Sequence, residues 1–255
     1  MKQLEDYADF IKETDFQLGQ PYLPQELCMD DDGILSTFYA PFDHINEHAE
    51  IVICGITPGL QQALLALREA SKQLRSGASV DVAREAAKNT GSFGGPMRRN
   101  LVRMLDFIGL HKKLGMPSCS ELFGINNRLV HYTSALRYPV FRHGKNYSGV
   151  PDMTGCPALR QQLDQNLSTE ITVLSNDAIY IPLGPKVEAA LKYMADKGAV
   201  HPSKILCGMP HPSGANAERI AFFLNEKAES DLSAKTNARR LSENREKIMS
   251  LVSAL

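Results

Sequence analysis

The sequence predicts an α/β fold in which a mostly parallel central sheet carries helices on both faces. Short apolar runs, each followed by turn residues, alternate along the chain with stretches whose apolar residues keep helical spacing. Parallel neighbours need crossover connections, so this alternation favours a three-layer α/β/α arrangement. In folds of this type, binding sites lie on loops at the carboxyl ends of the strands.

The first predicted strand is the apolar run at residues 51–56, which ends in a turn at residues 57–59. A helix follows as far as the small-residue stretch at 76–79, on the helical spacing of Leu60, Ala63, Leu64 and Leu67. A second helix follows the glycine-rich segment 91–96. Gly109 is its expected stop, and its apolar face consists of Leu101, Met104, Leu105 and Ile108.

Three later apolar runs predict strands at 129–135, 178–183 and 205–209. Helices are expected at 185–196 and from 217 to about 227. Segment 141–155 is expected to be an irregular loop, either a lid over a site or an ordinary surface loop.

The predicted strands and helices define a core domain at residues 46–226. Residues 1–45 are expected to form an acidic N-terminal extension of helix and strand that packs on this core. Residues 227–255 are expected to form a polar helical tail, because their apolar stripe is sparse.

Composition excludes several classes of protein. No apolar run approaches the roughly 20 residues that a bilayer helix needs, and the acidic start lacks the basic and apolar parts of a secretory signal. The five cysteines are widely spaced and indicate neither a disulfide framework nor a metal or cluster site. We therefore expect a cytoplasmic protein with reduced cysteines, no membrane contact, no metal and no cofactor.

The formal net charge of −1 hides an uneven distribution. Residues 1–50 hold two lysines and twelve acidic residues, whereas residues 91–147 hold nine Lys or Arg and two acidic residues. A basic segment of this kind can neutralise phosphates and attract a polyanion. A solvated face of scattered charges explains the same counts, and Arg98 and Arg99 fit either interpretation.

Four segments at or near the predicted strand ends carry short motifs. They are Gly55-Ile56-Thr57-Pro58-Gly59, Gly91-Ser92-Phe93-Gly94-Gly95-Pro96, Val130-His131-Tyr132-Thr133-Ser134 and His211-Pro212-Ser213-Gly214-Ala215-Asn216. In this order they resemble the signature segments of the uracil-DNA glycosylase superfamily. Each segment alone is a weak signal, but four in the correct order across residues 51–216 are specific as a set.

The resemblance implies a role for each segment. Thr57 would occupy the position that activates a water, with Ile56 beside it in contact with the base. Phe93 would stack on the extruded base, Ser134 would read its edge, and His211 would donate a hydrogen bond to the base as it departs. The expected DNA contacts, which include the two arginines of the basic segment, are Pro58, Gly59, Arg98, Arg99, Ser213, Gly214 and Asn216.

This chain departs from the family pattern at three positions. Thr57 stands where the best-known branches have a carboxylate or an amide, and a hydroxyl orients a water but is a poor base near neutral pH. Ser134 replaces an asparagine, so the edge contact is smaller and leaves space. Both changes favour a roomier pocket for a modified or bulky base. Ala215 replaces a larger apolar wedge, which implies weaker invasion of a duplex.

Several of these residues also have a purely structural interpretation. Thr57 precedes a proline and is suited to shaping a turn. Asn216 is suited to capping a helix, and a lone histidine such as His211 is more often structural than catalytic. Phe93 is flanked by glycines and is harder to explain as part of the core, so we expect its loss to spare the fold.

These observations predict a DNA glycosylase that hydrolyses the N-glycosidic bond of a modified or unusual base, such as a bulky modified cytosine in foreign DNA. No obligatory protein partner is expected, and in a bacterium the protein would associate with the nucleoid. Three alternatives stay open. They are a repair glycosylase for uracil or other deaminated bases, a non-catalytic relative that binds DNA, and an unrelated α/β enzyme whose glycine loops hold a nucleotide phosphate.

Overall fold

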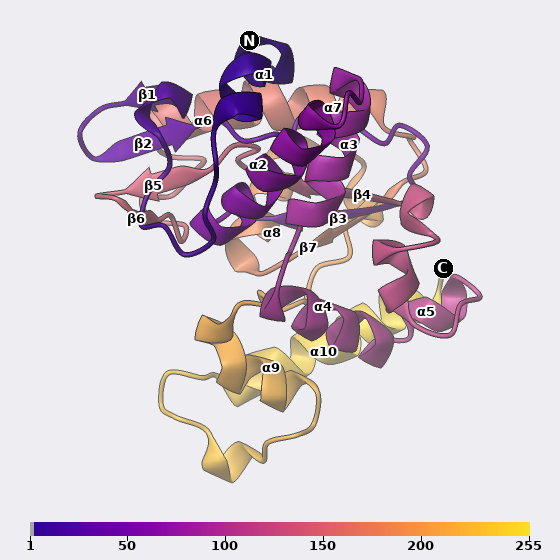
Figure 1. The fold of residues 1–255 in the computed structure, drawn as a ribbon. Helices are drawn as coiled ribbons and strands as arrows, with labels where there is room; N and C mark the ends of the chain where they lie inside the picture. Colours follow the sequence, from indigo (N-terminus) through magenta and orange to yellow (C-terminus); the bar gives the residue numbers. More distant parts are fainter. Residues whose placement is uncertain (1–2) are drawn as a thin grey trace. The chain divides into compact units, whose positions relative to one another are not determined.

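The computed structural model describes residues 3–255 and shows a mixed α/β fold (Figure 1). A parallel sheet has the strand order β4 (Val130–Ser134), β3 (Ile51–Gly55), β7 (Ile179–Pro182). Strands β3 and β7 pair in parallel, and all five residues of β3 are buried. An uninterrupted apolar run is typical of a strand covered on both faces. The predicted α/β class with a parallel sheet is therefore confirmed.

The run at 205–209 differs from its prediction. It forms no continuous strand and makes only two isolated parallel bridges, Tyr180↔Ile205 and Leu183↔Met209. Gly208, at φ +128°, turns the backbone between these bridges, and Cys207 N–H donates to the carbonyl of Ile205. The ladder is broken because this conformation turns backbone groups away from the neighbouring strand.

The chain divides into two compact units, which are described separately. The first unit contains the described part of Met1–Asn46, with Ile56–Gly94 and Tyr132–Val173. The second unit contains Glu47–Gly55, Gly95–His131 and Leu174–Leu255. The predicted acidic extension thus lies in the first unit, and the predicted tail lies in the second.

The first unit combines helices with an antiparallel sheet. Its helices are α1 (Leu4–Glu13), α2 (Leu60–Arg75), α3 (Val80–Gly91), α6 (Pro157–Gln162) and α7 (Ser168–Val173), with the 3₁₀ turn Gln25–Leu27 and the π-helical turn Leu163–Leu167. The sheet has the order β1 (Cys28–Asp31), β2 (Leu35–Phe38), β5 (Val140–Arg142), β6 (Lys145–Asn146). Figure 1 shows α2 and α3 side by side, and α1 completes the apolar cluster that they share.

Several elements of this unit were not predicted, namely α3, α6, α7 and the pair β5 and β6. Helix α3 begins at the N-cap Ser79, whose side chain accepts a hydrogen bond from Val82 N–H. Strands β5 and β6 pair around His143 and Gly144, both at positive φ, so the expectation of an irregular loop at 141–155 is wrong over 141–146. Two consecutive residues at positive φ form the tight turn that joins neighbouring antiparallel strands.

The second unit holds β3, β7 and the remaining helices. These are α4 (Pro96–Phe107), α5 (Leu110–Lys113), α8 (Pro185–Asp196), α9 (Ala217–Phe223) and α10 (Ala238–Ser253), with 3₁₀ turns at Cys119–Phe123, Asn127–Leu129, Pro202–Lys204, Gly214–Asn216 and Glu229–Asp231. Helix α9 ends earlier than predicted because Asn225, at φ +60°, leaves the helical conformation. No helix in residues 3–255 is both long enough and apolar enough to cross a membrane.

Candidate functional site: a pocket and a histidine loop

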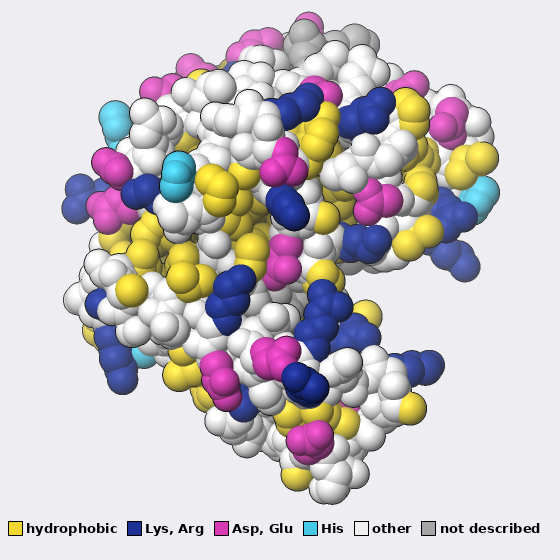
Figure 2. All heavy atoms as spheres, turned by 180° about the vertical axis from the view of Figure 1, so that it is seen from behind, with side chains coloured by type: hydrophobic (Ala, Val, Ile, Leu, Met, Phe, Trp, Pro, Cys, Tyr) yellow, Lys and Arg dark blue, Asp and Glu magenta, His cyan; other side chains and the backbone are white. Residues whose placement is uncertain are grey.

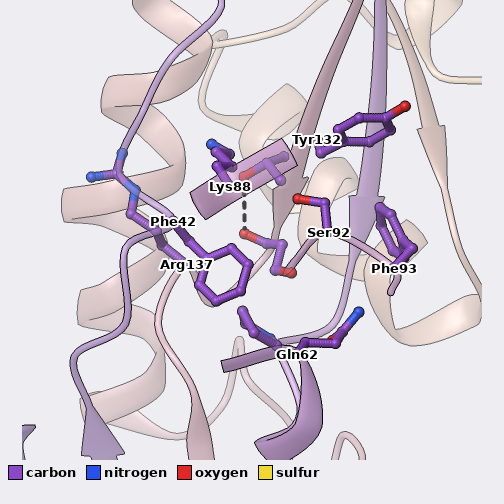
Figure 3. Close-up of a pocket in the computed structure, with 10 residues that line it drawn as sticks. Phe42, Gln62, Lys88, Ser92, Phe93, Tyr132 and Arg137 are labelled. Carbon is purple, nitrogen blue, oxygen red and sulfur yellow. Dashed lines mark hydrogen bonds between the residues drawn. The ribbon is translucent and has the colours of Figure 1, made fainter. Parts of the chain in front are cut away.

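A pocket in the first unit gathers residues from several separate segments of the chain. Its water-accessible volume is about 20 Å³, and it is lined by Phe42, Pro58, Gln62, Lys88, Ser92, Phe93, Tyr132, Thr133, Ser134 and Arg137 (Figure 3). Three of these residues, Pro58, Phe93 and Ser134, belong to three different motif segments singled out by the sequence. The structure brings those three segments to one cavity.

Phe93 forms an aromatic wall of the pocket. Its ring meets Tyr132 edge to face, with centroids 5.9 Å apart, and only 5% of the residue is exposed. The expectation that Phe93 lies outside the core is therefore wrong. Its φ of +51° is unusual for a bulky residue, and such strain persists only where the surrounding structure holds it.

The glycines beside Phe93 allow α2 and α3 to approach closely. A Cβ at Gly91 would lie 2.8 Å from the Cβ of Ala66, and a Cβ at Gly94 would lie 2.6 Å from Cδ1 of Leu65. Both distances are shorter than van der Waals contact. The glycine-rich segment therefore places Phe93 by fitting against α2.

The loop after β3 is fixed by internal hydrogen bonds. The hydroxyl of Thr57 donates to the carbonyl of Tyr138 (2.8 Å) and accepts from Val140 N–H (3.1 Å), which ties the loop to the segment that leads into β5. This geometry supports the turn-shaping role of Thr57, and its role in orienting a water stays a prediction. Ile56 lies at the start of the same loop, and its carbonyl accepts from Leu136 N–H.

The backbone N–H groups at the start of α2 also donate hydrogen bonds to side chains of this protein. Gly59 N–H donates to Oε1 of Gln62 (2.9 Å), and Leu60 N–H donates to Oδ1 of Asn146 (2.9 Å). A phosphate at Gly59 would have to displace these side chains. Contact of Pro58 and Gly59 with DNA stays a prediction.

One wall of the pocket is polar, and the sequence analysis did not identify it. Lys88, at 3% exposure, donates to the carbonyl of His44. Beside it, Nε and Nη2 of Arg137 donate to a carboxylate oxygen of Glu170 and to the carbonyl of Asn166. The Thr133 hydroxyl donates to the other oxygen of Glu170. The carboxylate of Glu170 is thus shared between a guanidinium and a hydroxyl.

The protonation of Lys88 responds to this environment. Burial lowers the pKa of its ammonium to about 8. The carboxylate of Glu170 opposes that shift, Arg137 adds to it, and Asp43 opposes it again. At neutral pH the ammonium is mostly protonated, although it is close to its titration point.

His211 lies in a braced loop of the second unit. Ser213 N–H donates to Nδ1 of His211 (3.2 Å), and Asn216 Nδ2 donates to the Ser213 hydroxyl (3.1 Å). Asn100, on α4, donates from Nδ2 to the carbonyl of Pro212 (3.0 Å). Gly184 lies against His211 and has a φ of +91°, a conformation that favours glycine. The sequence did not identify either Asn100 or Gly184.

The protonation state and tautomer of His211 follow from this arrangement. Burial lowers its pKa to about 4, so the imidazole is neutral at pH 7. Because Nδ1 accepts a hydrogen bond, the single ring proton lies on Nε2, which is the free donor. A neutral imidazole of this kind can stabilise a developing anion without first gaining a proton.

The other residues of this unit that were predicted to contact DNA lie in three different environments. Asn216 occupies the N-cap position of α9, but its side chain bonds to Ser213 and accepts from Arg219 instead of capping the helix. Gly214 begins the 3₁₀ turn of the same loop. Arg98 lies over the ring of Phe123, 4.6 Å from its centroid, whereas Arg99 is exposed.

The charge of segment 91–147 is partly neutralised by acidic residues from elsewhere in the chain. Arg103 pairs with Glu226, and Arg137 pairs with Glu170. Figure 2 shows Lys and Arg side chains interspersed with Asp and Glu on the face that it draws. Within residues 3–255, no cluster of three or more His, Cys, Asp or Glu is arranged to hold a metal ion. The five cysteines are free thiols.

Comparison with known proteins shows a relative in Bacillus subtilis (strain 168), described as "Uncharacterized protein YoxB". It is 35% identical to this chain over 195 residues, which cover 76% of each protein. The chain belongs to the same family as YoxB. No family model matches the sequence, and no solved structure matches it. The name of this relative assigns no ligand or reaction.

Proposed function

We propose that the chain is a DNA glycosylase that releases a modified or unusual base from DNA. The observation that carries this proposal is the convergence of three motif segments on one pocket with aromatic and polar walls. A base inside a duplex cannot be reached, so such an enzyme must extrude the nucleotide and bind its base in a pocket. An aromatic face and a polar edge contact are what an extruded base requires.

Each element of the site has a place in this chemistry. Phe93 offers a stacking surface, and Ser134 offers a hydroxyl at the end of β4. Cleavage of the glycosidic bond leaves negative charge on the departing base and positive charge on the sugar. The neutral His211 would donate from Nε2 to the departing base, so that charge develops against a fixed hydrogen-bond donor.

The proposal also specifies a fold family, a partner and a cellular location. The mixed α/β fold would be the three-layer arrangement of the uracil-DNA glycosylase superfamily. The partner would be DNA, the location would be the cytoplasm, and no obligatory protein partner would be needed. Removal of modified bases from foreign DNA and repair of deaminated bases are both consistent with the same chemistry.

A non-catalytic DNA-binding protein is the second candidate, and one observation favours it. The Thr57 hydroxyl is bonded on both sides to the backbone, which leaves it poorly placed to orient a water. A protein with the same pocket and no activated water would bind an extruded base without releasing it.

Incubation with modified DNA distinguishes the two candidates. Duplex and single-stranded oligonucleotides carrying uracil, hypoxanthine or glucosylated hydroxymethylcytosine are incubated with the protein and then treated with alkali, which breaks abasic strands. We expect strand breaks with at least one base, and much slower formation of these breaks with the His211→Ala variant. Retarded mobility without strand breaks would support the DNA-binding protein. If neither strand breaks nor retarded mobility were seen, both candidates would be excluded.

Phe93→Leu tests the stacking surface while keeping most of the apolar volume. Loss of a base-stacking ring costs roughly 1–3 kcal/mol, so we expect binding of the extruded base to fall by roughly 5- to 150-fold. The free energy of unfolding should change by less than about 1.5 kcal/mol. Binding is measured by fluorescence anisotropy and stability by urea denaturation. Unchanged affinity in a folded variant would remove Phe93 from the base site.

Arg99→Gln tests contact with the DNA backbone. If Arg99 contacts a phosphate, the slope of log K against log salt concentration should fall by about one. Arg239→Gln is the matched control, because Arg239 is exposed and pairs with Glu243 within α10. An unchanged slope for Arg99→Gln would place Arg99 outside the interface.

A further inference from the structure

The peptide unit between Pro212 and Ser213 is hydrogen-bonded at both ends. Its carbonyl accepts from Nδ2 of Asn100 (3.0 Å), and its N–H donates to Nδ1 of His211 (3.2 Å). Asn100 is half-buried and lies in the second turn of α4, so its amide reaches the histidine loop from another element of the second unit. A single peptide unit therefore connects α4 to the imidazole.

The orientation of this peptide unit determines the hydrogen bond to the imidazole. A trans peptide unit is planar and its C=O and N–H point in opposite directions, so a donor that holds the carbonyl also holds the N–H. A carbonyl only accepts, so the amide of Asn100 must present its NH₂ group to Pro212. With the carbonyl held, the Ser213 N–H stays directed at Nδ1 of His211, and the ring proton stays on Nε2.

The loop needs such a restraint because its sequence leaves this peptide unit free to turn. Proline fixes φ at Pro212, but the following peptide unit still rotates about ψ of that residue. Asn216 holds the hydroxyl of Ser213 (3.1 Å) instead of the peptide unit. We propose that Asn100 is a positioning residue for His211, which holds the Pro212–Ser213 peptide unit so that the imidazole keeps its proton on Nε2. The inference rests on the proposed function only for the reaction that His211 serves.

The chain of hydrogen bonds also strengthens Nε2–H as a donor. Hydrogen bonds in series polarise one another, so donation from Asn100 to the carbonyl makes the N–H of the same peptide unit a better donor. The bond from that N–H to Nδ1 draws electron density from the ring of His211. Nε2–H is then better suited to stabilise negative charge that develops on a ligand. Asn100 thus acts through His211 on both the place of the proton and the strength of the donor.

The first experiment observes the histidine itself and needs no substrate. Nitrogen-15 NMR of labelled histidine identifies the tautomer of His211, and amide hydrogen exchange reports the bond made by the Ser213 N–H. The parent protein should show one tautomer, with the proton on Nε2. Asn100→Ala removes the donor, and Asn100→Asp replaces it with an acceptor that repels the carbonyl of Pro212. Both variants should show mixed tautomers and exchange at Ser213 that is faster by roughly 2- to 10-fold, which corresponds to one hydrogen bond.

Asn225→Asp is the matched control for the change from amide to acid. Asn225 is exposed in the same unit, and its Oδ1 accepts from Arg245, a bond that a carboxylate keeps. This variant should leave the signals of His211 unchanged. Alanine is the best helix former, so α4 should persist in Asn100→Ala, which circular dichroism checks. A folded Asn100→Ala with the tautomer and the Ser213 exchange rate of the parent protein would overturn the role of Asn100.

The second experiment tests whether Asn100 acts through His211. Single-turnover base release is measured for Asn100→Ala, His211→Ala and the double variant. Loss of a group that orients a functional side chain typically costs roughly 10- to 100-fold, so Asn100→Ala should slow release by this factor in the parent protein. In the His211→Ala background the same change should slow release by less than about 2-fold. An equal loss in both backgrounds would mean that Asn100 acts on the fold or on another residue, and would overturn the inference.

The two experiments separate the role of Asn100 from the proposed function. A change of tautomer in Asn100→Ala, with no base release by the parent protein, would support the role of Asn100 and overturn the glycosylase proposal. Base release that is as fast in Asn100→Ala as in the parent protein would overturn the role of Asn100 and leave the glycosylase proposal standing.

Discussion

His211→Ala should lower the single-turnover rate of base release by roughly 100- to 1000-fold. In a dissociative cleavage most of the barrier is separation of charge, so the donor that faces the departing base contributes more than a group that orients a water. His211 is suited to this role because its ring is neutral at pH 7 and its Nε2 carries the proton. Removal of one preorganised donor to a developing anion costs about 2.7–4 kcal/mol of transition-state stabilisation.

The measurement uses enzyme in excess over labelled oligonucleotide, with Thr57→Ala and Ser213→Ala as comparisons. Thr57→Ala should lower the rate by less, since its hydroxyl is bonded to the backbone. Ser213→Ala keeps the backbone N–H that fixes the tautomer of His211 and should also have a small effect. If Thr57→Ala is the most damaging of the three, the role assigned to His211 is wrong.

The depressed pKa of His211 also has a consequence for stability. Its folded-state pKa of about 4 lies below the ordinary value of 6.5, so the unfolded chain binds more protons between these values. The contribution of neutral His211 to stability is therefore complete above pH 6.5 and is lost as pH falls toward 4. The base-release rate should accordingly hold its neutral-pH value down to about pH 5 in a protein that remains folded.

The parallel sheet was predictable because its strands are uninterrupted apolar runs followed by turn residues. The apolar runs at 51–55 and 179–182 can bury both of their faces in the middle of a parallel sheet. Few other kinds of secondary structure bury so short an apolar run on all sides. Helix α3 was missed because its buried residues are mostly alanine, such as Ala83 and Ala87, and a small-residue stripe gives a weak hydrophobic signal. The pairing of β5 with β6 depends on local positive φ at His143, for which the sequence offers little warning.

Some residues of the candidate site could be identified from the sequence and others could not. Pro58, Phe93 and Ser134 were found because they occur in motifs with a fixed order. Lys88 was missed because a lysine in a charged helical segment ordinarily lies on the solvent side. Its burial is a tertiary effect of the close approach of α2 and α3, which Gly91 permits. The one local signal is that Arg84 and Lys88 share a helix face beside the alanine stripe, which places two charged residues at the edge of the core.

Lys88→Met should make the free protein more stable at pH 7, by about 2 kcal/mol. The folded-state pKa of Lys88 is about 8 and its ordinary value is 10.5, so between these values the unfolded chain binds more protons and stability rises with pH. At pH 7 both states are protonated, and the full cost of burying the charge, roughly 3 kcal/mol, is present. Methionine removes that cost but leaves the carbonyl of His44 without its donor, which offsets about 1 kcal/mol.

Urea denaturation of the parent protein and Lys88→Met at pH 7, 9 and 10.5 measures this difference directly, because titration of all other groups cancels between the two proteins. The advantage of the variant should be largest at pH 7 and should fall to zero or slightly below by pH 10.5, where the parent lysine is neutral in the folded state and about half protonated in the unfolded chain. Lys72→Met, at an exposed position, should change stability by less than about 0.5 kcal/mol at each pH. A residue that only supports the fold would show the opposite result, with Lys88→Met less stable at pH 7. A gain in stability in the variant would mean that burial of this ammonium is a net cost to the folded protein.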